Sequence, residues 1–172
     1  MSIHSFKNVI SFGPEGNCMW DRYRQESKQT ICIIGVLILS AKLCRADGHF
    51  SEREEEAILK IVPHETQQKR SLIRILEEAY NDPNPIEHDA KNLKALLEDE
   101  HPEFLEFIVA ALYKLAHTDH VYSEAEDEDI RSVANIFGIT KSFFDQAEDT
   151  IKKYFIKASS SLRNKKKENV NA

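Results

Sequence analysis

The sequence is poor in the residues that make turns and covalent cross-links. It has only five glycines and five prolines in 172 residues, which argues against a turn-rich β fold. The three cysteines are Cys18, Cys32 and Cys44. Because their number is odd and no CxxC pair is present, the sequence predicts neither a disulfide framework nor a cysteine zinc site. The absence of a disulfide framework favours a cytoplasmic protein, in which Cys32 and Cys44 behave as small core residues.

Three further absences narrow the function. The formal net charge is -6, so the chain lacks the basic surface that nucleic-acid binding requires. The most apolar stretch, Ile31 to Leu39, is far shorter than a membrane-spanning helix, and no signal peptide is visible. No Gly-rich phosphate loop and no nucleophile in a recognisable setting is present. We therefore expect a protein without enzymatic activity, and no transmembrane segment.

Apolar residues recur at helical spacing through most of the chain, which predicts an all-α bundle of about seven to eight helices. The expected organisation is a partly helical N-terminal segment over 1–29, one helical domain over 30–156 and a disordered polar and basic tail over 157–172. The helix over 30–45 is apolar almost all round, which is typical of the central helix of a bundle. Gly35 within it predicts close approach of another helix, and Gly138 is placed to end a later helix. A last helix is expected from Thr140 to Ile156.

An internal repeat is the most informative feature. Residues 43–62 align without a gap on residues 115–134, at an offset of 72. Asp47, Ser51 and Glu54 meet Asp119, Ser123 and Glu126. Each unit reads as an apolar helix, a loop that opens with Asp, a Ser cap and an acidic second helix. Two such units predict a pseudo-two-fold arrangement that buries the apolar helices against each other.

The motif has two interpretations. In the first, Ser-x-x-Glu is a capping box that starts a helix, and the Asp bonds to backbone N–H groups of the loop. In the second, the two loops face each other and four carboxylates form a metal site: Asp47, Glu54, Asp119 and Glu126. Carboxylates suit Ca²⁺ or Mg²⁺, and His49 or His120 as an additional ligand would suit Zn²⁺ or Mn²⁺. The loops are not EF-hands, because the twelfth position from Asp47 is Ile58.

The two units resemble the TerB-like family, which includes tellurite-resistance TerB proteins and the N-terminal domain of the DnaJ-like co-chaperone DjlA. The residues that carry the resemblance are 43–54, 116–126 and 136–144. The resemblance implies a pseudo-symmetric all-α bundle and a metal-binding acidic cluster at positions 47, 54, 119 and 126. It also implies a stress-associated, non-enzymatic module that binds a protein partner, with peripheral membrane association through that partner. His120 departs from the family's usual Gly.

Three functions follow. The first is a TerB-like interaction module with a divalent-cation site in its two acidic loops. The second is a purely structural domain whose acidic loops only cap helices. The third is a metal-dependent hydrolase that uses the same carboxylates to activate a water. The chain lacks the His-Pro-Asp of a J-domain, because His101-Pro102-Glu103 does not match it, so direct stimulation of an Hsp70 is not expected.

Overall fold

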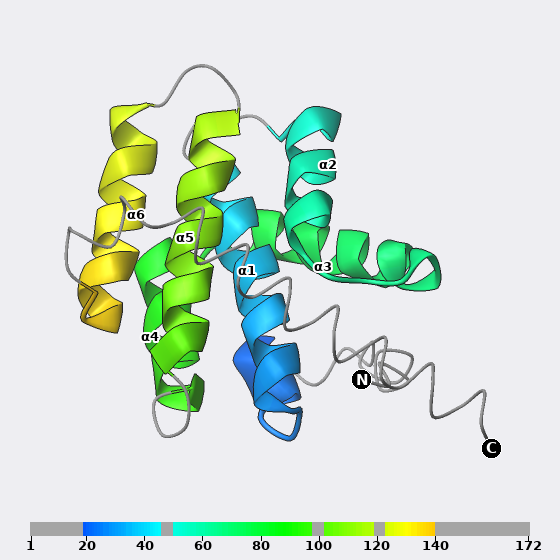
Figure 1. Cartoon of the computed structure of the whole chain (residues 1–172), viewed down its shortest axis with the longest axis horizontal. Helices are drawn as coiled ribbons and strands as arrows, with labels where there is room; N and C mark the ends of the chain where they lie inside the picture. The colour runs from blue at the N-terminus through cyan, green and yellow to red at the C-terminus, as the bar shows by residue number, and fades with distance from the viewer. Residues whose placement is uncertain (1–18, 46–49, 98–101, 119–122, 140–172) are drawn as a thin grey trace.

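The computed structural model describes residues 19–45, 50–97, 102–118 and 123–139. All regular secondary structure in these ranges is helical, which confirms the all-α class (Figure 1). Of the helices in these ranges, two are short 3-10 helices and six are α-helices. In chain order they are η2 (Met19–Tyr23), α1 (Lys28–Arg45), α2 (Glu52–Ile61), η3 (Thr66–Gln68), α3 (Lys69–Asn81), α4 (Ile86–Leu97), α5 (Pro102–Thr118) and α6 (Glu124–Phe137).

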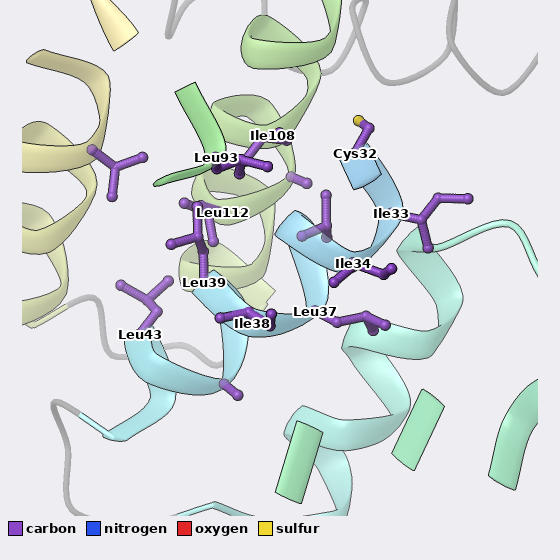
Figure 2. Packing of buried hydrophobic residues seen from close by; sticks show 14 of the residues in the cluster. Cys32, Ile33, Ile34, Leu37, Ile38, Leu39, Leu43, Leu93, Ile108 and Leu112 are labelled. Carbon is purple, nitrogen blue, oxygen red and sulfur yellow. The ribbon is translucent and has the colours of Figure 1, made fainter. Parts of the chain in front are cut away.

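Helix α1 is the centre of the bundle. Every residue from Thr30 to Cys44 is buried, and α3, α4 and α5 all pack extensively against the helix. Figure 2 shows α1 side chains leaving the helix in several directions, with Leu93 of α4 and Ile108 and Leu112 of α5 among the residues that surround it. A helix can be apolar all round only when neighbours cover every face, so the predicted central position of this helix is confirmed.

Helices α1 and α4 run antiparallel, as three pairs of contacts show. Lys42 near the end of α1 meets Asp89 in the first part of α4, and Lys28 at the start of α1 donates to the carbonyl of Leu96 near the end of α4. Between them, a Cβ placed on Gly35 would lie 2.5 Å from Leu93 Cδ2. The close approach predicted from Gly35 is therefore confirmed, and α4 is the helix that requires it.

The helix boundaries follow local capping chemistry. The Ser51 and Ser123 hydroxyls each accept a hydrogen bond from the backbone N–H three residues ahead, as N-caps do. Gly138 ends α6 with φ +73°, the left-handed conformation in which glycine carries no Cβ penalty. The predicted caps at all three positions are confirmed.

The two acidic helices begin at the same end of the bundle. In Figure 1, α1 and α5 rise toward the upper end of the view, and α2 and α6 start there and descend. Helix α3 instead runs across the bundle, and α4 returns along it. The ends of α1 and α5 and the starts of α2 and α6 therefore lie at one end of the bundle, although the internal symmetry itself stays a prediction.

The predicted bounds of the central helix, 30–45, agree with those of α1 to within two residues. In the segment 1–29, which was expected to be partly helical, the structure has the 3-10 helix η2, and α1 already begins at Lys28. Trp20 and Tyr23 of η2 are each 1% exposed, so the core includes side chains from before residue 30. The last helix expected at 140–156 and the tail at 157–172 lie outside the described residues.

Candidate functional site

Glu54 takes part in a complete capping box at the start of α2. Its Oε2 accepts a hydrogen bond of 2.8 Å from the backbone N–H of Ser51, whose hydroxyl in turn accepts from the Glu54 N–H. The side chain is half-buried, and Glu52 and Glu55 add negative charge to the same helix turn. Negative charge is favourable there because the helix dipole is positive at its N-terminus. The capping box predicted for this Glu is thus confirmed, and one of its carboxylate oxygens accepts the capping hydrogen bond.

Glu126 lies in the corresponding first turn of α6, where its N–H donates to Ser123 Oγ at 3.1 Å. The residue is 8% exposed, which makes it more buried than Glu54. Carboxylates are rarely buried unless a cation or hydrogen-bond donors compensate their charge. The burial of Glu126 therefore says more about a possible binding role than the half-buried position of Glu54 does. Glu126 also takes part in polar interactions beyond the cap.

The remaining predicted ligands lie outside the described residues. These are Asp47, Asp119, His49 and His120. The structure does fix the helix ends from which they depart, since α1, α2, α5 and α6 all have an end at the same side of the bundle (Figure 1). Within the described ranges alone, no three His, Cys, Asp or Glu side chains come together as a potential metal site.

A buried ion network around Lys42 lies below this end of the bundle. The Lys42 side chain is 1% exposed, and its ammonium nitrogen contacts Asp82 Oδ2 at 2.5 Å, Asp89 Oδ2 at 2.5 Å and the Asn84 carbonyl at 2.7 Å. Asp89 Oδ2 accepts no hydrogen bond and has the Lys42 ion pair as its compensation, while Asp89 Oδ1 accepts from Trp20 Nε1 at 2.9 Å. The ammonium donates hydrogen bonds to Asp82 Oδ2 and to the Asn84 carbonyl, and Asp89 balances its charge as an ion pair.

Arg45 and Phe50 connect the flanks of the first acidic loop to the end of α3. Arg45 donates to backbone carbonyls of the α3–α4 turn, at 3.0 Å to Asn84 and in a closer contact to Asp82. The ring of Phe50 packs on that of Tyr80, with centroids 5.4 Å apart. The residues on both sides of the segment 46–49 are therefore held by the same part of the bundle.

The carboxyl group of Asp129, near this end of the bundle, has a buried and acidic environment. Burial raises the pKa of Asp129 on α6 to about 6, and the negative charges of Glu87 and Glu128 add to the shift, while Arg45 opposes it. Asp129 is one turn beyond Glu126, and Glu87 lies in the first turn of α4. The carboxylate form of Asp129 is thus disfavoured in the folded protein, first because burial removes part of its hydration and second because two acidic neighbours face it against one guanidinium.

Asp129→Asn is expected to stabilise the domain at neutral pH. The pKa of about 6 in the folded state exceeds the ordinary value of 3.8, so the folded state binds more protons between these values, and stability falls as the pH rises through this window. Asn cannot ionise, so the Asp129→Asn variant does not lose this stability as the pH rises. We expect a gain of about 1 kcal/mol at pH 7.5, after allowance for solvent screening, and little change at pH 4. Urea unfolding at both pH values measures it.

Asp127→Asn is the matched control, because it removes the same charge two residues earlier in α6. Asp127 pairs with Arg131 at 2.5 Å, so its loss should destabilise slightly at pH 7.5. Equal effects of the two substitutions at both pH values would contradict the assignment to Asp129.

Comparison with known proteins assigns the family. The family model described as "Tellurite resistance protein TerB" matches residues 34–149, about two thirds of the chain. The chain belongs to the TerB family. No curated protein and no solved structure matches it. In the part of the TerB chain that the structure describes, no helix is long and apolar enough to cross a membrane.

The TerB match includes both acidic motifs and most of α1, and it confirms the resemblance inferred from the sequence. It begins after η2 and the first residues of α1, so Trp20 and Tyr23 precede the TerB-matched region.

Sequence reasoning missed the Lys42 network. A signal was present, because Lys42 is an isolated charge close to the end of an apolar helix and the break at 81–85 carries Asp82. The partner Asp89 and the donor Trp20 are distant in sequence from Lys42, and no local pattern connects them.

Proposed function

We propose that this TerB chain is a non-enzymatic, stress-associated interaction module that binds a divalent cation between its two acidic loops. The observation that carries the proposal is the placement of Glu54 and Glu126, which lie in the first turns of two helices that begin at the same end of the bundle (Figure 1). Chain connectivity joins Asp47 and Asp119 to that end. Four carboxylates at one end of the bundle would suit a hard cation such as Ca²⁺ or Mg²⁺.

The acidic neighbour of Asp129 supports this proposal. Burial is the main cause of the raised pKa of Asp129, but the negative charge of Glu87 adds to it, and a bound cation would offset that charge. The roles in the proposed site differ between residues. Glu54 keeps one oxygen on the cap of α2 and would offer the other, while Asp47 and Asp119 would be the principal ligands.

Calorimetric titration of the chelator-treated full chain with Ca²⁺, Mg²⁺, Mn²⁺ and Zn²⁺ tests the site. We expect binding of at least one cation, and a loss of affinity of tenfold or more in Asp47→Ala plus Asp119→Ala. The matched control is Glu56→Gln plus Glu128→Gln, which removes two exposed charges at equivalent positions of the two units. No binding at millimolar metal, or equal binding by both double variants, would reject the cation site.

The purely structural alternative is favoured by the complete capping box at Ser51 and Glu54. Glu54→Gln distinguishes the structural alternative from the cation site. The Gln carbonyl can still accept the hydrogen bond from the Ser51 N–H, but the charged carboxylate is lost. If Glu54 is a ligand, cation affinity falls and the urea midpoint of the metal-free protein stays the same. Unchanged affinity would leave Glu54 with the capping role alone.

The stress-associated role can be tested in cells. We expect that deletion of the coding sequence in the native host lowers survival on tellurite, and that the wild-type chain restores it. Asp47→Ala plus Asp119→Ala should fail to restore survival at equal protein level. Full restoration by that variant would separate any tellurite phenotype from the acidic loops.

A further inference from the structure

The 3-10 helix η2 makes contacts with both α3 and α4. On one side, Arg22 forms an ion pair with Glu78 of α3. On the other, Trp20 Nε1 donates to Asp89 of α4 at 2.9 Å. The rings of Trp20 and Tyr23 meet edge to face with centroids 6.3 Å apart, and both residues are 1% exposed. Burial raises the pKa of Tyr23 to about 12, so its phenol stays neutral within this contact.

Helices α3 and α4 have little direct contact with each other to replace these. They are consecutive, but α3 runs across the bundle and packs mainly on α1, whereas α4 runs along the bundle and packs on both α1 and α6 (Figure 1). The four residues between them, 82–85, are held from α1 by Lys42 and Arg45. Helix η2 therefore adds a second attachment, between helices that diverge.

Trp20 also completes the Lys42 network. Asp89 is 1% exposed. Its Oδ1 accepts a hydrogen bond from the Trp20 indole N–H, and its Oδ2 forms the ion pair with Lys42. Without the indole, Oδ1 would lose its hydrogen bond and remain a buried acceptor without a donor, which is unfavourable. Release of η2 would therefore remove a hydrogen bond from Asp89. Because Asp89 pairs with Lys42, and Lys42 also binds Asp82 and Asn84, the loss would weaken the α3–α4 turn.

We propose that Met19–Tyr23 is a latch that joins α3 to α4, and that its release loosens the α3–α4 turn while α5 and α6 stay packed. Helix α5 packs mainly on α1, and α6 packs on α5 as well as along α4, so most of their contacts do not involve η2. Such partial opening is the usual behaviour of a locally weak unit in a folded domain. The latch precedes the TerB-matched residues and is independent of the cation site. A protease or partner that captures this segment would therefore act on the α3–α4 turn.

Hydrogen–deuterium exchange on the full chain tests the latch. Trp20→Phe plus Arg22→Met keeps an aromatic ring but removes the indole N–H and the ion pair to α3. We expect exchange of amides in residues 79–90 to accelerate about tenfold, with less than a twofold change in 104–116 and 130–137. The matched control is Arg24→Met, because the Arg24 side chain is 66% exposed and its ion pair with Asp21, at 2.8 Å, is local and does not join η2 to α3 or α4. It should leave all three regions unchanged.

Arg22→Met alone decides the question if the double variant does not fold. Its ion pair is partly exposed, so the variant should fold, and it should accelerate exchange in 79–90 about threefold. Uniform acceleration in all regions would show a general loss of stability and overturn the latch. No acceleration in 79–90, or the same acceleration with Arg24→Met, would overturn it as well.

Discussion

Lys42→Met is expected to lower the free energy of unfolding by about 3–5 kcal/mol, the cost of removing one partner from a buried ion pair. Met fills a similar volume, but Asp89 would remain buried with a charge that no cation compensates. The Asp82 carboxylate and the Asn84 carbonyl would lose the same donor. Urea unfolding followed by circular dichroism measures the change, because a domain of this size exposes enough surface for a cooperative transition.

Lys28→Met is the control, since it changes the same residue type in the same helix. Lys28 is half-buried and donates one hydrogen bond of 2.6 Å to the Leu96 carbonyl, so its loss should cost about 1 kcal/mol. In Lys42→Met plus Asp89→Asn, the uncompensated charge is gone and Asn can still accept from Trp20. This double variant should therefore be more stable than the sum of the two single effects predicts. Equal costs for Lys42→Met and Lys28→Met would contradict the buried network.

Gly35→Val is expected to destabilise the domain by about 3 kcal/mol, at the upper end for overpacking a core. A Cβ at this position would lie 2.5 Å from Leu93 Cδ2 and 2.9 Å from Leu93 Cδ1. Leu93 is fully buried, so it cannot move aside into solvent. Valine also gains little from helix propensity relative to glycine, in contrast to alanine. Thermal or urea unfolding gives the difference directly.

The contact partner can be identified by a double-mutant cycle. Leu93→Ala alone should cost about 2–5 kcal/mol through the cavity that it leaves. Combined with Gly35→Val, the new methyl groups occupy part of that cavity, so the two costs should fall short of additivity by at least about 1 kcal/mol. Ala95→Val on the exposed face of α4 is the control for β-branching and should cost well under 1 kcal/mol. Strict additivity would indicate that another residue limits the space at Gly35.

Local signals predicted most of the helices correctly. The caps at Ser51, Ser123 and Gly138 depend on residues within four positions of one another, and an all-apolar segment such as α1 has only one stable environment, the centre of a bundle. Gly35 was interpretable for the same reason, because a costly residue inside a helix needs a compensating contact.

The polar interior was not predictable in the same way. Trp20 and Asp89 are 69 positions apart, and Lys42 and Asp82 are 40 apart. Nothing in the sequence around Trp20 indicates a buried carboxylate as its partner, since the contact depends on how α4 packs on α1. For the candidate site, the sequence indicated which residues repeat and which start helices. It could not decide whether Glu54 serves the helix cap, a cation or both, because one motif satisfies each requirement.

The central position of α1 has a consequence for synthesis of the chain on the ribosome. Helix α1 is made before the segments that chiefly bury it, α3, α4 and α5, the last of which ends at Thr118. About 70 further residues must therefore be added before its cover is complete, which takes roughly 4–14 s at ordinary elongation rates. During that interval an 18-residue segment with Ile31–Leu39 at its centre is available to other nascent chains and to chaperones. The order of helices along the chain thus makes the nascent form of this protein more prone to aggregation than its folded form.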